Sequence, residues 1–104
     1  KKITIKKKYI IFSGIGNPKT FEKTLLNKKF KIIKSIVFPD HYQYKNKDID
    51  KIKKLAKNLN ANILTTEKDY MRLNNYDKKN INFIKVNLVV KDERKLINFL
   101  KNKL

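Results

Sequence analysis

Three short segments combine residue types that bind or transfer charged groups, and each follows a run of β-branched or aromatic residues. They are Gly14-Ile15-Gly16-Asn17-Pro18, Phe38-Pro39-Asp40-His41-Tyr42 and Thr65-Thr66-Glu67-Lys68-Asp69. If the preceding runs are parallel strands, the segments meet at the carboxyl edge of one sheet, where open α/β folds gather their ligands. Their position alone therefore makes them candidates for one common site.

The first segment holds both glycines of the chain, Gly14 and Gly16. Glycine allows a positive φ and the close approach of another group. Asn17 is a suitable N-cap, and Pro18 suits the first turn of a helix, whose free N–H groups favour an anion. A tight strand-to-helix turn explains the same residues without a ligand, so both interpretations stay open.

The second segment contains His41, the only histidine. Its ordinary pKa lies near neutrality, which suits it to proton transfer. Asp40 precedes it, but neighbouring side chains on an extended backbone point apart, so a simple dyad does not follow. An exposed turn shaped by Pro39 is the structural alternative. One His, no Cys and one adjacent Asp do not make a metal ligand set, and we predict no metal site in this chain.

The third segment pairs Thr66 with Asp69, a spacing that resembles a capping box with Asp in place of Glu or Gln. This structural interpretation competes with a functional one. In the functional one, Glu67, Lys68 or Asp69 faces the same cleft as His41.

Hydrophobic patterning predicts strands and helices in alternation along a single domain, residues 1–104. Strands are expected at 3–5, 9–13, 31–38, 62–65 and 81–86, and helices from residue 18, at 47–59, 67–73 and 92–103. The alternation predicts an α/β fold: a small, mostly parallel sheet of four or five strands flanked by about four helices, as a Rossmann-like sandwich.

Composition bounds the function further. Lys and Arg number 27 against 9 acidic residues, a net charge of +18 that would suit nucleic acid or an anionic membrane. Lys, Asn and Ile fill half of the chain, however, which is typical of an AT-rich genome. Only two residues are Arg, which argues against sequence-specific DNA binding. The absence of Cys excludes disulfides, and glycines only at 14 and 16 exclude a P-loop.

Taken in order and at their separations, GIGNP, FPDHY and TTEKD resemble the C-terminal domain of the tetraacyldisaccharide 4'-kinase family. The resemblance runs from about Tyr9 to the last expected helix. The chain departs from the family pattern at Tyr42, where a second His is common. It also has Tyr70 and Met71 before Arg72, where small residues and then a Lys are usual.

The resemblance implies an ATP-dependent lipid kinase of lipid A and lipopolysaccharide biosynthesis. It would phosphorylate the 4'-hydroxyl of tetraacyldisaccharide 1-phosphate with Mg²⁺, as a peripheral enzyme on the cytoplasmic face of the bacterial inner membrane. The family's N-terminal domain carries the P-loop and binds most of the ATP and Mg²⁺. Without that domain, this chain is expected to be inactive alone. Its implied partners are the N-terminal domain, the anionic lipid disaccharide and the membrane surface, not nucleic acid.

The resemblance also implies roles for individual residues. His41, beside Asp40, matches the family histidine that helps to activate the sugar hydroxyl with an Asp from the N-terminal domain. The remaining candidates would lie on the nucleotide or substrate side of the cleft; they are Gly14, Gly16, Asn17, Thr66, Glu67, Lys68 and Asp69.

Two other hypotheses remain. One is a small basic module that binds nucleic acid or membrane without catalysis, its motifs being only turns and caps. The other is a remnant without activity.

Overall fold

A computed structural model of the chain describes residues 6–85. Its elements are β1 (Lys8–Ser13), α1 (Pro18–Asn27), β2 (Lys31–Val37), α2 (Asn46–Leu59), β3 (Asn62–Thr66), α3 (Glu67–Met71) and β4 (Ile81–Ile84). The predicted boundaries of these elements differ from the observed ones by at most two residues. The strand expected at 3–5 and the helix expected at 92–103 lie outside the described residues.

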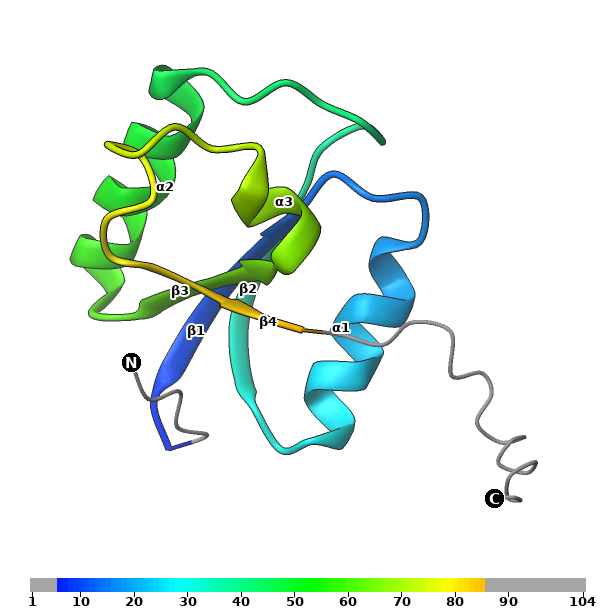
Figure 1. Cartoon of the computed structure of the whole chain (residues 1–104). Helices are drawn as coiled ribbons and strands as arrows, with labels where there is room; N and C mark the ends of the chain where they lie inside the picture. The colour runs from blue at the N-terminus through cyan, green and yellow to red at the C-terminus, as the bar shows by residue number, and fades with distance from the viewer. Residues whose placement is uncertain (1–5, 86–104) are drawn as a thin grey trace.

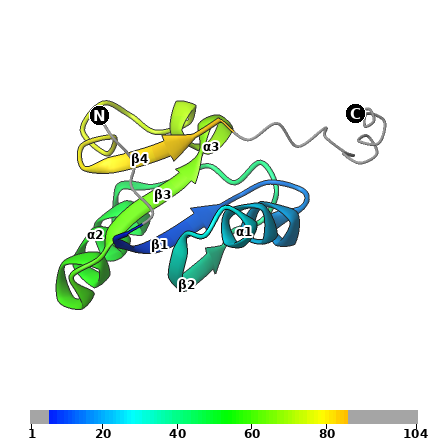
Figure 2. The ribbon, with the colours of Figure 1, turned by 90° about the horizontal axis from the view of Figure 1, so that it is seen from below.

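The four strands form one sheet in the order β2-β1-β3-β4, and Figures 1 and 2 show the strands side by side. All three neighbouring pairs are parallel. The predicted α/β class with a mostly parallel sheet is therefore confirmed. Within residues 6–85 the counts are four strands and three helices, slightly below the predicted numbers.

Alternate residues of the central strand β1 build two hydrophobic cores. Ile10 and Phe12 pack with the apolar face of α2, whereas Tyr9 and Ile11 pack with Phe21 and other residues of the α1 side. Because successive strand residues point to opposite faces, α1 covers one face of the sheet and α2 the other (Figure 1). No helix within residues 6–85 is long and apolar enough to cross a membrane.

The strand order decides where the three predicted segments lie. Strand β1 sits between β2 and β3, and all three run in the same direction. The connections that follow these strands therefore leave from one edge of the sheet, beside the start of α3 (Figure 1).

Candidate active site

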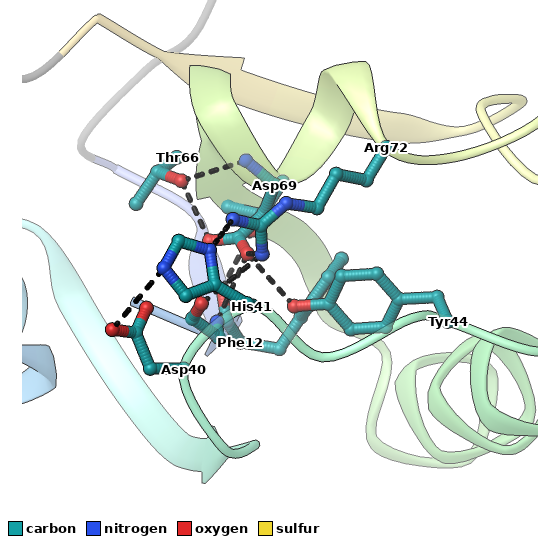
Figure 3. Close-up of polar contacts among 9 residues, drawn as sticks. Phe12, Asp40, His41, Tyr44, Thr66, Asp69 and Arg72 are labelled. Atoms are coloured by element: carbon teal, nitrogen blue, oxygen red, sulfur yellow. Dashed lines mark hydrogen bonds and ion pairs between the residues drawn. The ribbon is translucent and has the colours of Figure 1, made fainter. Parts of the chain in front are cut away.

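The buried carboxylate of Asp69 is the centre of the polar network at this edge (Figure 3). Its Oδ1 accepts hydrogen bonds from the Gly14 N–H at 2.9 Å and from the Tyr44 hydroxyl at 2.9 Å. Its Oδ2 accepts one from the Thr66 hydroxyl at 2.6 Å. One side chain thus joins the connections that follow β1, β2 and β3, with Tyr44 as its partner just after the Phe38–Tyr42 segment.

Asp69 reaches this position because it lies in the first turn of α3. Thr66 is the N-cap of this helix, and its Oγ1 accepts a hydrogen bond from the Asp69 N–H at 3.0 Å. The predicted cap by Thr66 is therefore confirmed, but within residues 6–85 the reciprocal bond of a capping box is not formed, because the Asp69 carboxylate accepts from the Gly14 N–H and from the Tyr44 and Thr66 hydroxyls. The same cap aims the Asp69 carboxylate at Gly14 and Tyr44, so the structural and functional interpretations of this pair are not exclusive.

Gly14 is needed for close packing. A Cβ at Gly14 would stand 3.0 Å from the Pro39 carbonyl oxygen and 3.1 Å from the Tyr44 hydroxyl. Neither glycine of the chain has a positive φ, so the left-handed freedom considered from the sequence is not used. A Cβ at Gly16 would lie 3.4 Å from a carboxylate oxygen of Asp40, an ordinary contact distance.

His41 lies in a tight turn that is attached to β1. The Tyr42 N–H donates to the Pro39 carbonyl at 3.0 Å, and the His41 N–H donates to the Gly14 carbonyl at 3.1 Å. The φ of His41 is +63°, in the left-handed region that glycine and asparagine usually occupy in such turns. Lys29, Asn60 and Asn80 also have a positive φ, so this conformation marks a turn and does not by itself mark a functional site.

This turn also brings the side chains of Asp40 and His41 together. The His41 Nε2 lies 3.7 Å from an Asp40 carboxylate oxygen, and the two side chains are 74% and 49% exposed. The extended backbone considered from the sequence would have pointed them apart. The left-handed conformation of His41 changes that geometry, so the pair stands together at the surface.

Arg72 connects His41 to the buried carboxylate. Its Nη1 donates to the Gly14 carbonyl at 3.1 Å and lies 3.6 Å from Asp69 Oδ1. Its Nη2 lies 3.4 Å from His41 Nδ1 (Figure 3). Sequence analysis gave Arg72 no role in the site. The available signal was its type, because an arginine is rare in this lysine-rich chain.

Tyr44 is a second residue that sequence analysis missed. Its ring packs edge-to-face on Phe12 and Phe38, with centroid separations of 5.4 Å and 5.1 Å. Burial, with the negative charge of Asp69 next, raises the pKa of the Tyr44 hydroxyl well above its ordinary range. The hydroxyl therefore stays protonated and donates to Asp69. No local pattern marks this tyrosine, since its partner lies 25 residues away.

The other predicted residues lie nearby with different partners. The Asn17 side chain accepts from the Thr20 N–H at 3.2 Å and so caps α1, as predicted. Glu67 and Lys68 begin α3, but no hydrogen bond or ion pair within residues 6–85 joins either to His41. Of the acidic and basic candidates in the third segment, Asp69 is the one that the structure connects to His41.

The chemistry available at this edge is that of an exposed imidazole on a fixed support. The exposed ring of His41 can meet a reacting group from solvent. Arg72 contacts its Nδ1, and Arg72 lies in turn beside the Asp69 carboxylate. Within the described part of the chain, no cluster of three or more His, Cys, Asp or Glu side chains could hold a metal ion. A hollow of about 600 Å³ bordered by Lys53, Lys57 and Asn80 includes no residue of the three segments.

A family model and individual known proteins match this chain, and they name the same family. The family model for tetraacyldisaccharide-1-P 4'-kinase matches residues 1–104. The tetraacyldisaccharide 4'-kinase of Pelagibacter ubique is 52% identical over 92 residues, which is 88% of this chain and 29% of that protein. The kinases of the same name from Rickettsia bellii and Rickettsia typhi are 46% and 45% identical, over 64% and 70% of this chain.

The chain spans between 21% and 29% of the length of these relatives. No solved structure matches it.

Proposed function

Because the chain belongs to the tetraacyldisaccharide-1-P 4'-kinase family, we propose that it forms the C-terminal part of an ATP-dependent lipid kinase. The acceptor is the 4'-hydroxyl of a tetraacyldisaccharide 1-phosphate. The observation that carries this proposal is the placement of His41. Its side chain is exposed at the carboxyl edge of the sheet. Its backbone N–H donates to the Gly14 carbonyl after β1, and its ring contacts Arg72 at the end of α3.

The proposed step is a phosphoryl transfer. The 4'-hydroxyl oxygen attacks the γ-phosphorus of ATP, a new P–O bond forms, and the bond to the bridging β–γ oxygen breaks, so ADP leaves. The hydroxyl proton passes to a carboxylate of the N-terminal domain, beside which His41 is placed when the domains close. Phosphoryl transfer depends mostly on positioning and on charge stabilisation, so a rigidly held side chain on a closing domain is a suitable contribution.

ATP and Mg²⁺ belong in this proposal to the N-terminal domain and its P-loop. Residues 6–85 offer no cluster of metal-binding side chains, so no step is assigned to a metal on this chain. The glycine segment has no P-loop pattern either, because glycines occur only at 14 and 16. The expected division is that the N-terminal domain binds nucleotide and metal, and this chain completes the cleft.

The substrate and the membrane are the remaining proposed partners. A disaccharide 1-phosphate with acyl chains is anionic and lies in a membrane, so the kinase would act as a peripheral enzyme on the cytoplasmic face of the inner membrane. The net charge of +18 is compatible with this proposal, since lysines near an anionic surface are attracted by about 1 kcal/mol each, but an AT-rich genome accounts for the lysine content as well.

A chimeric kinase tests the role of His41. This chain replaces the matching 92-residue region of the Pelagibacter ubique kinase. We expect His41→Ala to lower kcat by about 10²–10⁴-fold, the usual range for a group that assists proton transfer. Lys54→Gln, on the exposed face of α2, is the matched control and should keep full turnover.

Circular dichroism and ATP binding show whether each variant is folded. If His41→Ala folds, binds ATP and turns over like the unsubstituted chimera, the proposed role of His41 is wrong.

A further inference from the structure

The side chain of Arg72 faces one specific atom of the imidazole. Its Nη2 lies 3.4 Å from His41 Nδ1, whereas His41 Nε2 points toward Asp40 at 3.7 Å (Figure 3). A guanidinium has only donors, so the ring nitrogen that it faces must accept. In a neutral imidazole the other nitrogen then carries the hydrogen, which makes Nε2–H a donor.

The guanidinium is itself held in place. Arg72 is 23% exposed, its Nη1 donates to the Gly14 carbonyl at 3.1 Å, and the buried Asp69 carboxylate lies 3.6 Å away. That carboxylate is in turn fixed by the Gly14 N–H and the Tyr44 hydroxyl. The position of Arg72 is therefore set by the fold, and His41 is the exposed end of this chain of contacts.

We propose that Arg72 is the positioning residue for His41: it fixes Nδ1 as an acceptor and leaves Nε2–H as an exposed donor on the side of Asp40. His41 then works as a hydrogen-bond donor to an oxygen of the reacting partners, and a carboxylate elsewhere accepts the proton of the sugar hydroxyl. The tautomer is a property of this chain alone, whereas its importance for turnover rests on the proposed kinase function.

The single histidine allows a direct test on this chain. Long-range ¹H–¹⁵N correlation spectra, recorded where the imidazole is neutral, distinguish an acceptor nitrogen from an N–H nitrogen without overlap. We expect the unsubstituted chain to show Nδ1 as the acceptor and Nε2 as N–H. Arg72→Met should move both resonances toward the averaged positions of free histidine. Arg72→Lys, which keeps a donor, and the control Lys54→Gln should keep the original pattern.

Turnover in the chimera separates positioning from a merely structural role. If Arg72 acts through His41, Arg72→Met lowers kcat about 10-fold with KM unchanged, and has no further effect when His41 is already Ala. Arg72→Lys should restore most of kcat. A structural role predicts instead that Arg72→Met lowers turnover by the same factor in both backgrounds.

The proposal is overturned if Nδ1 carries the hydrogen, if Arg72→Met leaves the ring resonances unchanged, or if the two substitutions act independently. A chimera that folds and binds ATP but is inactive would contradict the kinase function and would leave the tautomer result standing. The failures of the two proposals are therefore distinguishable.

Discussion

Replacing His41 by glycine should stabilise the protein relative to replacing it by alanine. Both substitutions remove the imidazole and its contacts with Asp40 and Arg72. They differ in the backbone, because the φ of +63° at this position is strained for any residue with a Cβ. The left-handed conformation costs roughly 1–2 kcal/mol for such a residue, and glycine avoids that cost.

Glycine also loses more conformational freedom on folding, which costs roughly 0.5–1 kcal/mol. The midpoints of these two costs leave His41→Gly more stable than His41→Ala by about 0.8 kcal/mol, or about 3–6 °C in Tm for a domain of this size. Thermal unfolding of the two variants, followed by circular dichroism, measures it. Both should be equally deficient in turnover in the chimera.

Equal melting temperatures for the two variants would refute the reasoning, because they would mean that His41 is not held in a strained conformation. If glycine were the less stable variant, the turn would not be left-handed in solution.

Four further substitutions test the packing of the site and one other buried carboxylate. Asp69→Ala leaves the buried Gly14 N–H and the Tyr44 hydroxyl without their acceptor. The free energy of unfolding, measured in urea, should therefore fall by about 3 kcal/mol or more, against about 0.5–2 kcal/mol for the loss of a helix cap alone. A decrease no larger than that for a cap would contradict the network. Gly14→Ala should lower the free energy of unfolding by about 1–3 kcal/mol, because its new Cβ would meet atoms at 3.0 Å and 3.1 Å. Gly16→Ala should lower it much less, because its Cβ meets no atom so closely. Equal urea midpoints for the two variants would count against close packing at Gly14. Burial raises the pKa of the Asp77 carboxyl above 3.8, and its Oδ1 has no hydrogen-bond partner within residues 6–85. The folded state then binds a proton more readily than the unfolded state, so this group stabilises the fold at low pH and the stabilisation is lost as pH rises through the raised pKa. In Asp77→Asn, the urea midpoint should no longer fall as the pH rises through the acidic range. If its pH profile matches that of the unsubstituted chain, the Asp77 carboxyl does not have a raised pKa.

The secondary structure could be predicted because local residues decide it. The run 9–13 is β-branched and aromatic and ends at Gly14, and Asn17 with Pro18 marks the helix start that follows. Repeated alternation of such units gave the parallel sheet, and a parallel sheet brings the ends of its strands to one edge. That edge is where the three segments were found.

The connections between the segments could not be predicted in the same way. The contacts of Arg72 with Gly14 and with His41 span 58 and 31 residues, and no local pattern encodes such distances. The spacing of Thr66 and Asp69 predicts a helix cap, but it does not predict where the Asp69 carboxylate points. The positive φ of His41 was not foreseen either, since glycine is the residue expected there.

The product of the chimeric kinase tests the central claim most directly. The chimera carries this chain in place of the matching region of the Pelagibacter ubique kinase, and the assay supplies ATP, Mg²⁺ and tetraacyldisaccharide 1-phosphate. We expect mass spectrometry to find one phosphate added to the disaccharide at the 4'-position, with one ADP formed for each phosphate transferred. A chimera that is folded and binds ATP yet yields no such product would contradict it.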